Sequence, residues 1–197
     1  MARWIFLRHG ESSANAGGFL AGWDDVPLTP LGVEQAVAAG RALAGVPFER
    51  VVVSDLRRAQ HTASLALDAR GGEHPTPLVD HRLRERHLGQ WSGVSLEALR
   101  ADGRNAELLG WDTAPPDGES HLTMMLRVLP ALVELGEGPD TLMVSHGGLL
   151  RALLGLLDGT PTEQIGRVRI PNAQSITRDL SPGVFSRIYE SLLSSAR

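Results

Sequence analysis

Residues 4–7, Trp-Ile-Phe-Leu, form a short apolar run that leads directly into Arg8-His9-Gly10-Glu11. Apolar, partly β-branched runs of this length are typical of buried strands in a parallel sheet. The same arrangement recurs at two further places, where Val51–Val53 precedes Ser54-Asp55-Leu56-Arg57-Arg58 and Thr141–Val144 precedes Ser145-His146-Gly147-Gly148. The sequence therefore predicts three buried strands, each of which ends in a polar segment.

Helical patterns lie between these strands. Thr29 is a good N-cap with Pro30 at the first helical position, and an apolar stripe follows through Val33, Ala36, Val37, Gly40 and Leu43. Further helices are predicted over 57–69, over 122–135 and over 149–157, and Pro130 is expected to kink or break the second of these. The alternation of strands and helices predicts a layered α/β fold.

The middle of the chain departs from this alternation. The segment from Asp80 to Pro116 is rich in arginine, glycine and polar residues and shows no clear strand, which indicates an insertion or cap over one end of the sheet. No fixed-period repeat and no low-complexity tract marks a boundary. We expect one domain over residues 1–197 that carries this insertion.

Composition limits the classes of partner. The chain has a formal net charge of -4 and a pI near 6.0, which argues against nucleic acid or an anionic membrane as a partner. It contains no cysteine and no lysine, which excludes thiolate chemistry, a P-loop lysine and a Schiff base, whereas arginine forks that bind phosphate remain available. The apolar run before Arg8 is too short for a signal peptide, so we expect a cytoplasmic protein.

The three polar segments are expected to converge. In open parallel sheets the ligand crevice lies beyond the carboxyl ends of the strands, so residues that follow different strands meet there. Two histidines and two or three arginines would repel one another unless a dianionic ligand lay between them, and a phosphoryl group supplies that charge. The sequence therefore predicts a phosphate site at the carboxyl ends of the strands.

These segments resemble the motifs of the histidine phosphatase superfamily, in its phosphoglycerate mutase-like branch. The resemblance runs through most of the chain in the family's order. It is carried by Arg8-His9-Gly10-Glu11 with Asn15, by Gly22-Trp23 with Leu28-Thr29 and Gly32, by Ser54, Arg58, Ala59, Thr62 and Ala63, by Leu83-Arg84-Glu85 with Gly89, Trp91 and Gly93, by Gly118-Glu119-Ser120, and by Val144-Ser145-His146-Gly147-Gly148. Membership implies a three-layer α/β/α fold around a mostly parallel sheet, and a phosphatase or mutase activity.

The resemblance also implies roles that suit the chemistry of each residue. His9 is the expected nucleophile, with one ring nitrogen attacking phosphorus while the other stays protonated against a backbone acceptor. Arg8 and Arg58 are expected to grip the phosphoryl oxygens, and His146 to donate a hydrogen bond to one of them. Further substrate contacts are expected from Asn15, Gly22, Trp23 and Gly147.

Glu85 is the expected proton donor to the leaving oxygen, and then the base for the attacking water. This role suits a carboxyl whose pKa is raised in a closed site. Its neighbours Arg84 and Arg86 would instead lower the pKa of Glu85 if their side chains pointed toward it. The sequence leaves the two directions open.

The other histidines and arginines have simpler interpretations. Arg57 is assigned to a solvated or salt-bridged helix face, and the surface or structural histidines are expected to be His61, His74, His81, His87 and His121. The spacing of His81, Glu85 and His87 would suit a metal, but no second cluster supports one, so we expect neither a metal nor another cofactor. Glu11 either braces the first loop or touches the ligand.

The sequence favours a phosphomonoesterase that hydrolyses small phosphorylated metabolites through a phosphohistidine. A cofactor-dependent phosphoglycerate mutase and a non-catalytic phosphate-binding regulator are the alternatives, while the absence of a G-x-S-x-G elbow argues against a serine hydrolase. Sugar phosphates, phosphoglycerate derivatives and nucleotide-loop phosphates are all open as substrates. Self-association of the chain is also open.

Hydrolysis is preferred to mutase activity because of the segment that follows Glu85. The resemblance implies that mutases carry a Tyr three residues after the acid and paired arginines later, whereas this chain has Leu88 there and only isolated Arg100 and Arg104. Arg84, Arg86 or Arg100 could still supply the carboxylate contacts of a mutase.

Overall fold

The structure of the protein is a computed structural model, and it describes residues 1–195. A single five-stranded sheet has the strand order β3-β2-β4-β1-β5. The strands are β1 (Ala2–Arg8), β2 (Arg50–Ser54), β3 (Leu78–Asp80), β4 (Thr141–Ser145) and β5 (Ser175–Leu180). Only β5 runs antiparallel, alongside β1. The fold is therefore the mostly parallel α/β class that the sequence predicts.

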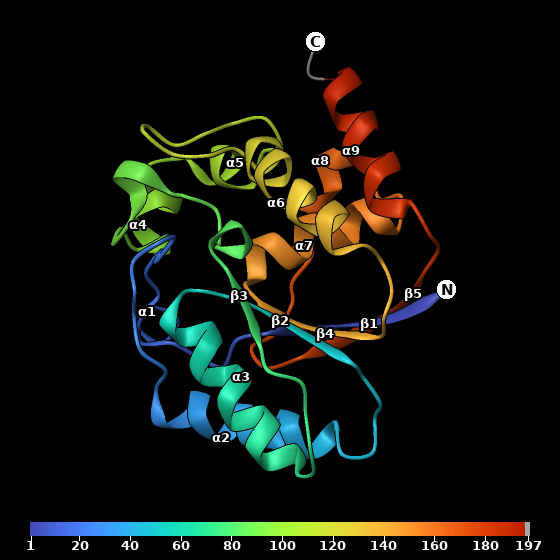
Figure 1. Cartoon of the computed structure of the whole chain (residues 1–197). Helices are drawn as coiled ribbons and strands as arrows, with labels where there is room; N and C mark the ends of the chain where they lie inside the picture. Colours follow the sequence, from blue (N-terminus) through green and yellow to red (C-terminus); the bar gives the residue numbers. More distant parts are fainter. Residues whose placement is uncertain (196–197) are drawn as a thin grey trace.

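Helices cover both faces of this sheet (Figure 1). One face carries α2 (Pro30–Ala42) and α3 (Arg57–Arg70), and the other carries α6 (His121–Leu135), α7 (Gly147–Leu157) and α9 (Val184–Ser195). The short helices are α1 (Ser13–Gly17), α4 (Leu96–Ala101), α5 (Asn105–Leu109) and α8 (Thr162–Ile165), with single 3-10 turns η1 (His81–Leu83) and η2 (Gly89–Trp91). Within the described residues, no helix is both long enough and apolar enough to span a bilayer.

The central strands are apolar throughout because both of their faces are covered. Trp4 and Phe6 of β1 belong to the core cluster under α6, α7 and α9. Ile5 and Leu7 of the same strand belong to the cluster under α2 and α3. Alternate residues of one strand thus enter two cores, which is why the strand reads as a continuous apolar run.

Helix α6 runs through Pro130 without a break. A proline inside a helix removes one backbone hydrogen bond and costs about 3 kcal/mol. Leu129, Ala131 and Leu132 beside it are fully buried in the core, and their packing holds the helix together. The break that the sequence allowed at Pro130 does not occur, because tertiary packing outweighs the local penalty.

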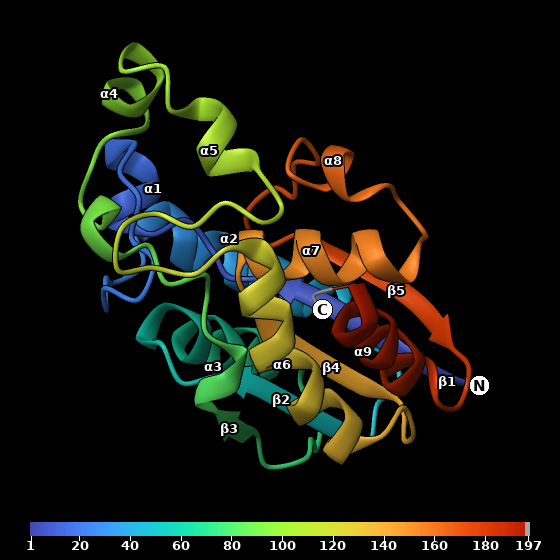
Figure 2. The same cartoon turned by 90° about the horizontal axis from the view of Figure 1, so that it is seen from above.

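The segment predicted as an insertion contains only short elements. Figure 2 shows α4 beside α1, with α5 next along the chain, at the end of the molecule far from the N-terminus. Leu88, Trp91 and Leu99 form a small apolar cluster of their own, separate from the two cores of the sheet. Backbone hydrogen bonds join Leu20 to Val94 and Gly93, so the segment is attached to the loop after α1.

Candidate active site

His9 comes directly after β1, and its backbone N–H donates to Ser145 O at the end of β4 (2.9 Å). Its ring Nδ1 lies 2.6 Å from Gly10 O. Because a carbonyl oxygen only accepts, Nδ1 carries the hydrogen and Nε2 keeps its lone pair. Burial, reinforced by the charges of Arg58 and Arg8, holds the pKa of His9 well below its usual value of 6.5. His9 is thus a neutral imidazole whose free nitrogen is Nε2.

His146 follows β4 and is fully buried beside His9, with the two ring centroids 5.3 Å apart. Its Nε2 lies 2.8 Å from Ser54 Oγ, and that hydroxyl already accepts the N–H of Leu56 (3.3 Å). When the Ser54 hydroxyl donates its hydrogen to Nε2, the ring hydrogen of His146 lies on Nδ1. Nδ1 is buried and has no partner among the described residues. His146 can donate this N–H to a phosphoryl oxygen.

Arg58 lies in the first turn of α3 and is 2% exposed. Its two terminal nitrogens donate to Asp24 O and Gly22 O, both at 2.8 Å. Arg8, the last residue of β1, donates to Ile170 O (2.6 Å), while its Nε is buried without a partner. Neither guanidinium forms a salt bridge within residues 1–195. Two desolvated cations that form no direct ion pair in this part of the chain favour an anionic ligand.

Arg57, next to Arg58 in the chain, points away from this site and is exposed. Adjacent residues at the start of a helix face different directions, and the structure assigns the buried position to Arg58. Gly22 contributes through its backbone, because its carbonyl orients Arg58.

Glu85 lies against the N-terminus of α7. Its carboxylate accepts from the backbone N–H groups of Gly148 (2.8 Å), Leu149 (3.0 Å) and Arg86 (2.9 Å). A Cβ at position 148 would collide with the Glu85 carboxylate, so a glycine is required for this approach. Burial alone would raise the pKa of Glu85, but the hydrogen bonds from Arg86 and Gly148, with the charges of Arg151 and Arg58, lower it overall.

This settles the direction that the sequence left open. The pKa of Glu85 is lowered in the free protein, and neither flanking arginine side chain is the main cause. Arg84 points away and forms a bidentate pair with Asp55 (2.6 Å). Arg86 acts on Glu85 through its backbone N–H, while its side chain donates to Leu108 O (2.9 Å) and lies 3.2 Å from His121 Nδ1.

We call the segment 81–87 the acid loop. Arg127 of α6 binds backbone carbonyls of this loop. The guanidinium of Arg127 donates to the carbonyls of Arg82 (2.7 Å) and Glu85 (3.2 Å). It also pairs with both oxygens of Glu119 (2.7 and 2.8 Å), and Glu119 in turn accepts the backbone N–H of His87 (2.9 Å). The Gly118-Glu119-Ser120 motif thus fixes the acid loop as well as starting α6, a role that the sequence did not reveal.

Trp23 was expected to contact substrate, but it belongs to this support. Its Nε1 donates to Glu85 O (2.7 Å), and its ring lies under the guanidinium groups of Arg84 and Arg127, 5.0 and 5.5 Å away. It is not among the residues that line the cavity in the described part of the chain. Trp23 therefore supports the acid loop and does not line the substrate cavity, contrary to the expectation from the sequence.

Asn15 is oriented by a residue that the sequence reasoning missed. Asn172, before β5, donates through Nδ2 to Asn15 Oδ1 (3.0 Å) and to His9 O (3.1 Å). Asn15 Oδ1 also accepts the backbone N–H of Ser12 (3.1 Å). Its oxygen is thereby engaged, and its Nδ2 is left as the donor that faces the cavity. No local pattern announces Asn172, because it lies 157 residues from Asn15 in the sequence.

These side chains surround a cavity of about 740 Å³. Its lining includes Arg8, His9, Asn15, Gly22, Arg58, Glu85 and Gly147. Gly147 gives space to Arg8, whose Nε would lie only 3.0 Å from a Cβ at that position. The structure therefore brings most of the residues singled out from the sequence to one place, and His146 lies buried beside them.

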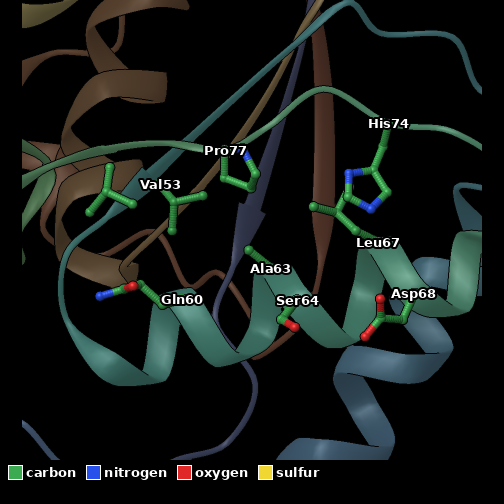
Figure 3. Close-up of a pocket in the computed structure, with 9 residues that line it drawn as sticks. Val53, Gln60, Ala63, Ser64, Leu67, Asp68, His74 and Pro77 are labelled. Atoms are coloured by element: carbon green, nitrogen blue, oxygen red, sulfur yellow. The ribbon is translucent and has the colours of Figure 1, made fainter.

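A smaller hollow of about 360 Å³ lies beside α3 (Figure 3). Its lining is largely apolar or uncharged, and Asp68 and His74 are the ionisable side chains in it. It lacks the convergent polar groups of the larger cavity, which is therefore the candidate active site.

The histidines near Glu85 do not gather around it. His81 is largely exposed and lies 3.9 Å from Asp80, whereas His87 packs on Trp23 with ring centroids 4.6 Å apart. Within the described residues, no group of three or more histidine, aspartate or glutamate side chains is arranged to hold a metal ion. His121 is buried in the wall of the cavity, where burial and the charge of Arg86 lower its pKa to about 4.

This α/β fold, with two neutral histidines and two unpaired arginines at the strand ends, defines a phosphoryl-handling protein. Residues 4–186 match the family model of the histidine phosphatase superfamily (branch 1). The chain belongs to this superfamily.

The relatives include both phosphatases and mutases. A glucosyl-3-phosphoglycerate phosphatase of Mycolicibacterium vanbaalenii is 37% identical over 206 residues, covering 94% of this chain and 90% of the relative. A 2,3-bisphosphoglycerate-dependent phosphoglycerate mutase of Methylorubrum extorquens is 36% identical over 177 residues, covering 84% of each chain. The comparisons support phosphatase or mutase activity.

Solved structures give the same picture. A mycobacterial glucosyl-3-phosphoglycerate phosphatase in complex with VO3 superposes with a TM-score of 0.78 at 34% identity, covering 90% of this chain and 92% of that one. An alpha-ribazole phosphatase from Shigella flexneri has a TM-score of 0.76 at 32% identity, covering 91% of both chains.

Proposed function

We propose that this protein hydrolyses small phosphomonoesters through a phosphohistidine at His9, without a metal. The observation that carries the proposal is the state of His9. The imidazole is neutral, its Nδ1–H is fixed on Gly10 O, and its free Nε2 lies at a cavity that Arg8 and Arg58 make cationic. The free lone pair on Nε2 is what allows His9 to attack phosphorus. The two guanidinium groups can bind the negatively charged oxygens of the phosphoryl group.

In the first step Nε2 of His9 forms a bond to phosphorus, and the bond from phosphorus to the ester oxygen breaks. Arg8, Arg58 and the Nδ1–H of His146 stabilise the charge on the phosphoryl oxygens. Glu85 delivers a proton to the departing oxygen, so the product leaves as an alcohol. The lowered pKa of Glu85 in the free protein fits this role, because an arriving phosphoryl dianion raises it again.

In the second step water attacks the phosphohistidine. Glu85, now ionised, takes a proton from that water, and the bond from phosphorus to Nε2 breaks. Inorganic phosphate leaves, and His9 returns to its neutral form. The cycle consumes one ester and one water, and it uses groups of the cavity lining together with His146 buried beside them.

Hydrolysis is favoured over mutase activity by the position three residues after Glu85. Leu88 is 5% exposed and packs with Trp91 and Leu99, so this wall of the cavity offers no hydroxyl. Of the two isolated arginines in the segment, Arg100 lines the cavity and Arg104 does not. A mutase must grip a carboxylated substrate in two orientations, and this segment supplies little for that task.

The covalent step is tested by rapid-quench labelling with a radiolabelled phosphomonoester. Phosphate that is stable in base and labile in acid should appear on the wild type and be missing from His9→Ala, which should also lose turnover. Full activity in His9→Ala would overturn the mechanism. Activity should survive exhaustive chelation, and vanadate should inhibit strongly because it mimics the five-coordinate transition state.

A coupled mutase assay with 2,3-bisphosphoglycerate, run beside phosphate release on the same enzyme, decides between the two branches. Phosphate release should be the faster reaction. Mutase turnover that exceeds hydrolysis would show that the chain is a mutase.

A further inference from the structure

The cavity carries far more positive charge than one phosphoryl group requires. Seven arginines line it, and Glu85 is its single acidic residue within residues 1–195. The seven are Arg8, Arg58, Arg86, Arg100, Arg151, Arg167 and Arg169. None of them forms a salt bridge in that part of the chain, whereas five arginines elsewhere do. In a chain of net charge -4, such a concentration of unpaired arginines indicates a site for anions.

Three of the seven are already assigned. Arg8 and Arg58 serve the phosphoryl group, and Arg86 is held by Leu108 O and His121. Arg100 stands on the cap, in α4. The remaining three come from α7 and from the segment between α8 and β5. We call Arg151, Arg167 and Arg169 the Arg151 cluster.

Arg151 is the best defined member of the cluster. It lies one turn after the N-terminus of α7, and one terminal nitrogen donates to Gly166 O (2.7 Å). Its Nε is buried and has no partner in the described structure. It lines the cavity, and its charge acts on Glu85, Arg8, Arg86 and His121. A desolvated guanidinium with one neutral acceptor is poorly satisfied by the protein alone.

Arg167 and Arg169 extend this positive surface to the rim of the cavity. Both are exposed, and neither side chain donates a hydrogen bond within residues 1–195. Burial lowers the pKa of Arg8, and the charge of Arg169 lowers it further, so the electrostatic effect of Arg169 reaches the phosphoryl pocket. All three arginines of the cluster line the same cavity as Glu85.

We propose that the Arg151 cluster binds a second anionic group, a carboxylate or a second phosphate, on the leaving alcohol of the substrate. The proposal rests on the proposed function, because Glu85 marks where the leaving oxygen must lie. Arg151 is the first of the charges that act on Glu85. A carbon attached to the leaving oxygen thus lies beside Glu85, and an anionic substituent on the neighbouring carbons can reach Arg151.

The Arg151 cluster is not the set of arginines that the sequence suggests for the carboxylate contacts of a mutase. The arginines weighed from the sequence for a carboxylate were Arg84, Arg86 and Arg100, in and after the acid loop. Arg84 is paired with Asp55 and Arg86 is engaged by Leu108 and His121, so Arg100 alone stays free among them. The Arg151 cluster is contributed by a different part of the chain.

The test uses matched substrates. In the first pair, 3-phosphoglycerate carries a carboxylate where glycerol 3-phosphate carries a hydroxymethyl group. In the second pair, fructose 1,6-bisphosphate carries a second phosphate that fructose 6-phosphate lacks. We expect the wild type to prefer the anionic member of at least one pair by about tenfold or more in kcat/KM, the effect of one good charge-assisted contact. The pair that shows the preference identifies the second group.

The variants are Arg151→Gln and the double variant Arg167→Gln/Arg169→Gln, whose exposed side chains can be replaced without disturbing the core. Either should reduce the preference about tenfold, measured as the ratio of kcat/KM within a pair, because an effect on Glu85 that is common to both members cancels in that ratio. Arg41 is an exposed residue of α2 that does not line the cavity. Arg41→Gln removes one positive charge there and should leave the preference intact. A preference near one in the wild type, or one that survives both cluster variants, overturns the proposal. An equal loss in Arg100→Gln also overturns it, because the effect would then belong to the charge of the whole cavity.

Calorimetry on His9→Ala separates this proposal from the proposed function. If 3-phosphoglycerate or fructose 1,6-bisphosphate binds more tightly than its partner, and Arg151→Gln removes the difference, the subsite stands even when the wild type hydrolyses nothing. If hydrolysis occurs but neither rates nor binding respond to the second anion, the function stands and the subsite is wrong.

Discussion

The phosphate side of the cavity and its leaving-group side are built in different ways. On the phosphate side, His9 and His146 follow β1 and β4 directly, Arg58 follows β2 by four residues, and all three are buried. On the leaving-group side, Glu85 stands in a loop between η1 and η2, and the Arg151 cluster reaches the cavity from α7 and a loop before β5. One side is anchored at the strand ends, and the other is assembled from two loops and helix α7.

This difference matches what the two sides bind. Every phosphomonoester presents the same phosphoryl group, so that half of the site can be rigid. Leaving groups vary, and loops can change without disturbing the sheet. Positioning of the acid loop then falls to tertiary contacts such as those of Arg127 and Glu119.

The largest effect is expected on the phosphate side. Arg58→Gln should lower kcat/KM by about 10²- to 10³-fold for alkyl and aryl phosphates alike, because Arg58 acts on the group that they share. The positive charge of Arg58 also lowers the pKa of His9, so an NMR titration of His9 should move upward toward 6.5 in this variant. Arg57→Gln, the exposed neighbour, is the matched control and should change neither quantity. A loss of activity confined to alkyl esters would contradict this prediction, because Arg58 would then act on the leaving group and not on the phosphoryl group.

A slightly smaller and selective effect is expected on the other side. Glu85→Gln should slow the hydrolysis of alkyl phosphates by about 10²-fold, and that of esters with acidic leaving groups far less, since a good leaving group needs little protonation. The ratio of the two rates is the measurement. Equal losses on both classes would remove Glu85 from the role of proton donor.

The division also explains how much of the molecule the sequence predicts. The buried strands and the helices over 30–42, 57–70 and 147–157 follow from apolar patterns and from the Thr29 cap. Residues directly after those strands must meet at one edge of the sheet, which is why His9, Arg58 and His146 could be placed from the sequence.

The parts that escaped prediction depend on contacts between distant segments. The edge strands β3 and β5 are half exposed and lack an apolar run. Trp23 was expected at the ligand but supports the acid loop, and the carboxylate of Glu85 accepts two N–H groups of α7 from residues 63 and 64 positions away. Asn172 has no pattern around it. Periodicity reports burial along one element and carries no information about which loop a side chain meets.

A third effect, of about tenfold, should follow from loosening the acid loop. Arg127→Gln removes the donors to the carbonyls of Arg82 and Glu85, so Glu85 should be held less firmly against α7. The loss should fall on alkyl phosphates, and it should shrink when Glu85 is already Gln, because Arg127 acts through Glu85. Arg178→Gln, which breaks the bidentate pair with Asp158 far from the loop, is the control. Equal losses on alkyl and aryl esters would indicate general destabilisation instead of positioning.

The smallest effect is expected at Arg84, which ties the acid loop to the end of β2. Arg84 forms a bidentate pair with Asp55, but their side chains are 31% and 23% exposed, so solvent screens the attraction. Arg84→Gln should therefore cost less than about 1 kcal/mol in a urea titration and change the rate ratio of alkyl to aryl phosphates by about twofold at most. The loop would still be held by Arg127 and by the bond from Trp23 to Glu85 O. An effect of Arg84→Gln that exceeds that of Arg127→Gln would mean that the strand end itself positions Glu85, and the leaving-group side would then be anchored in the sheet as firmly as the phosphate side.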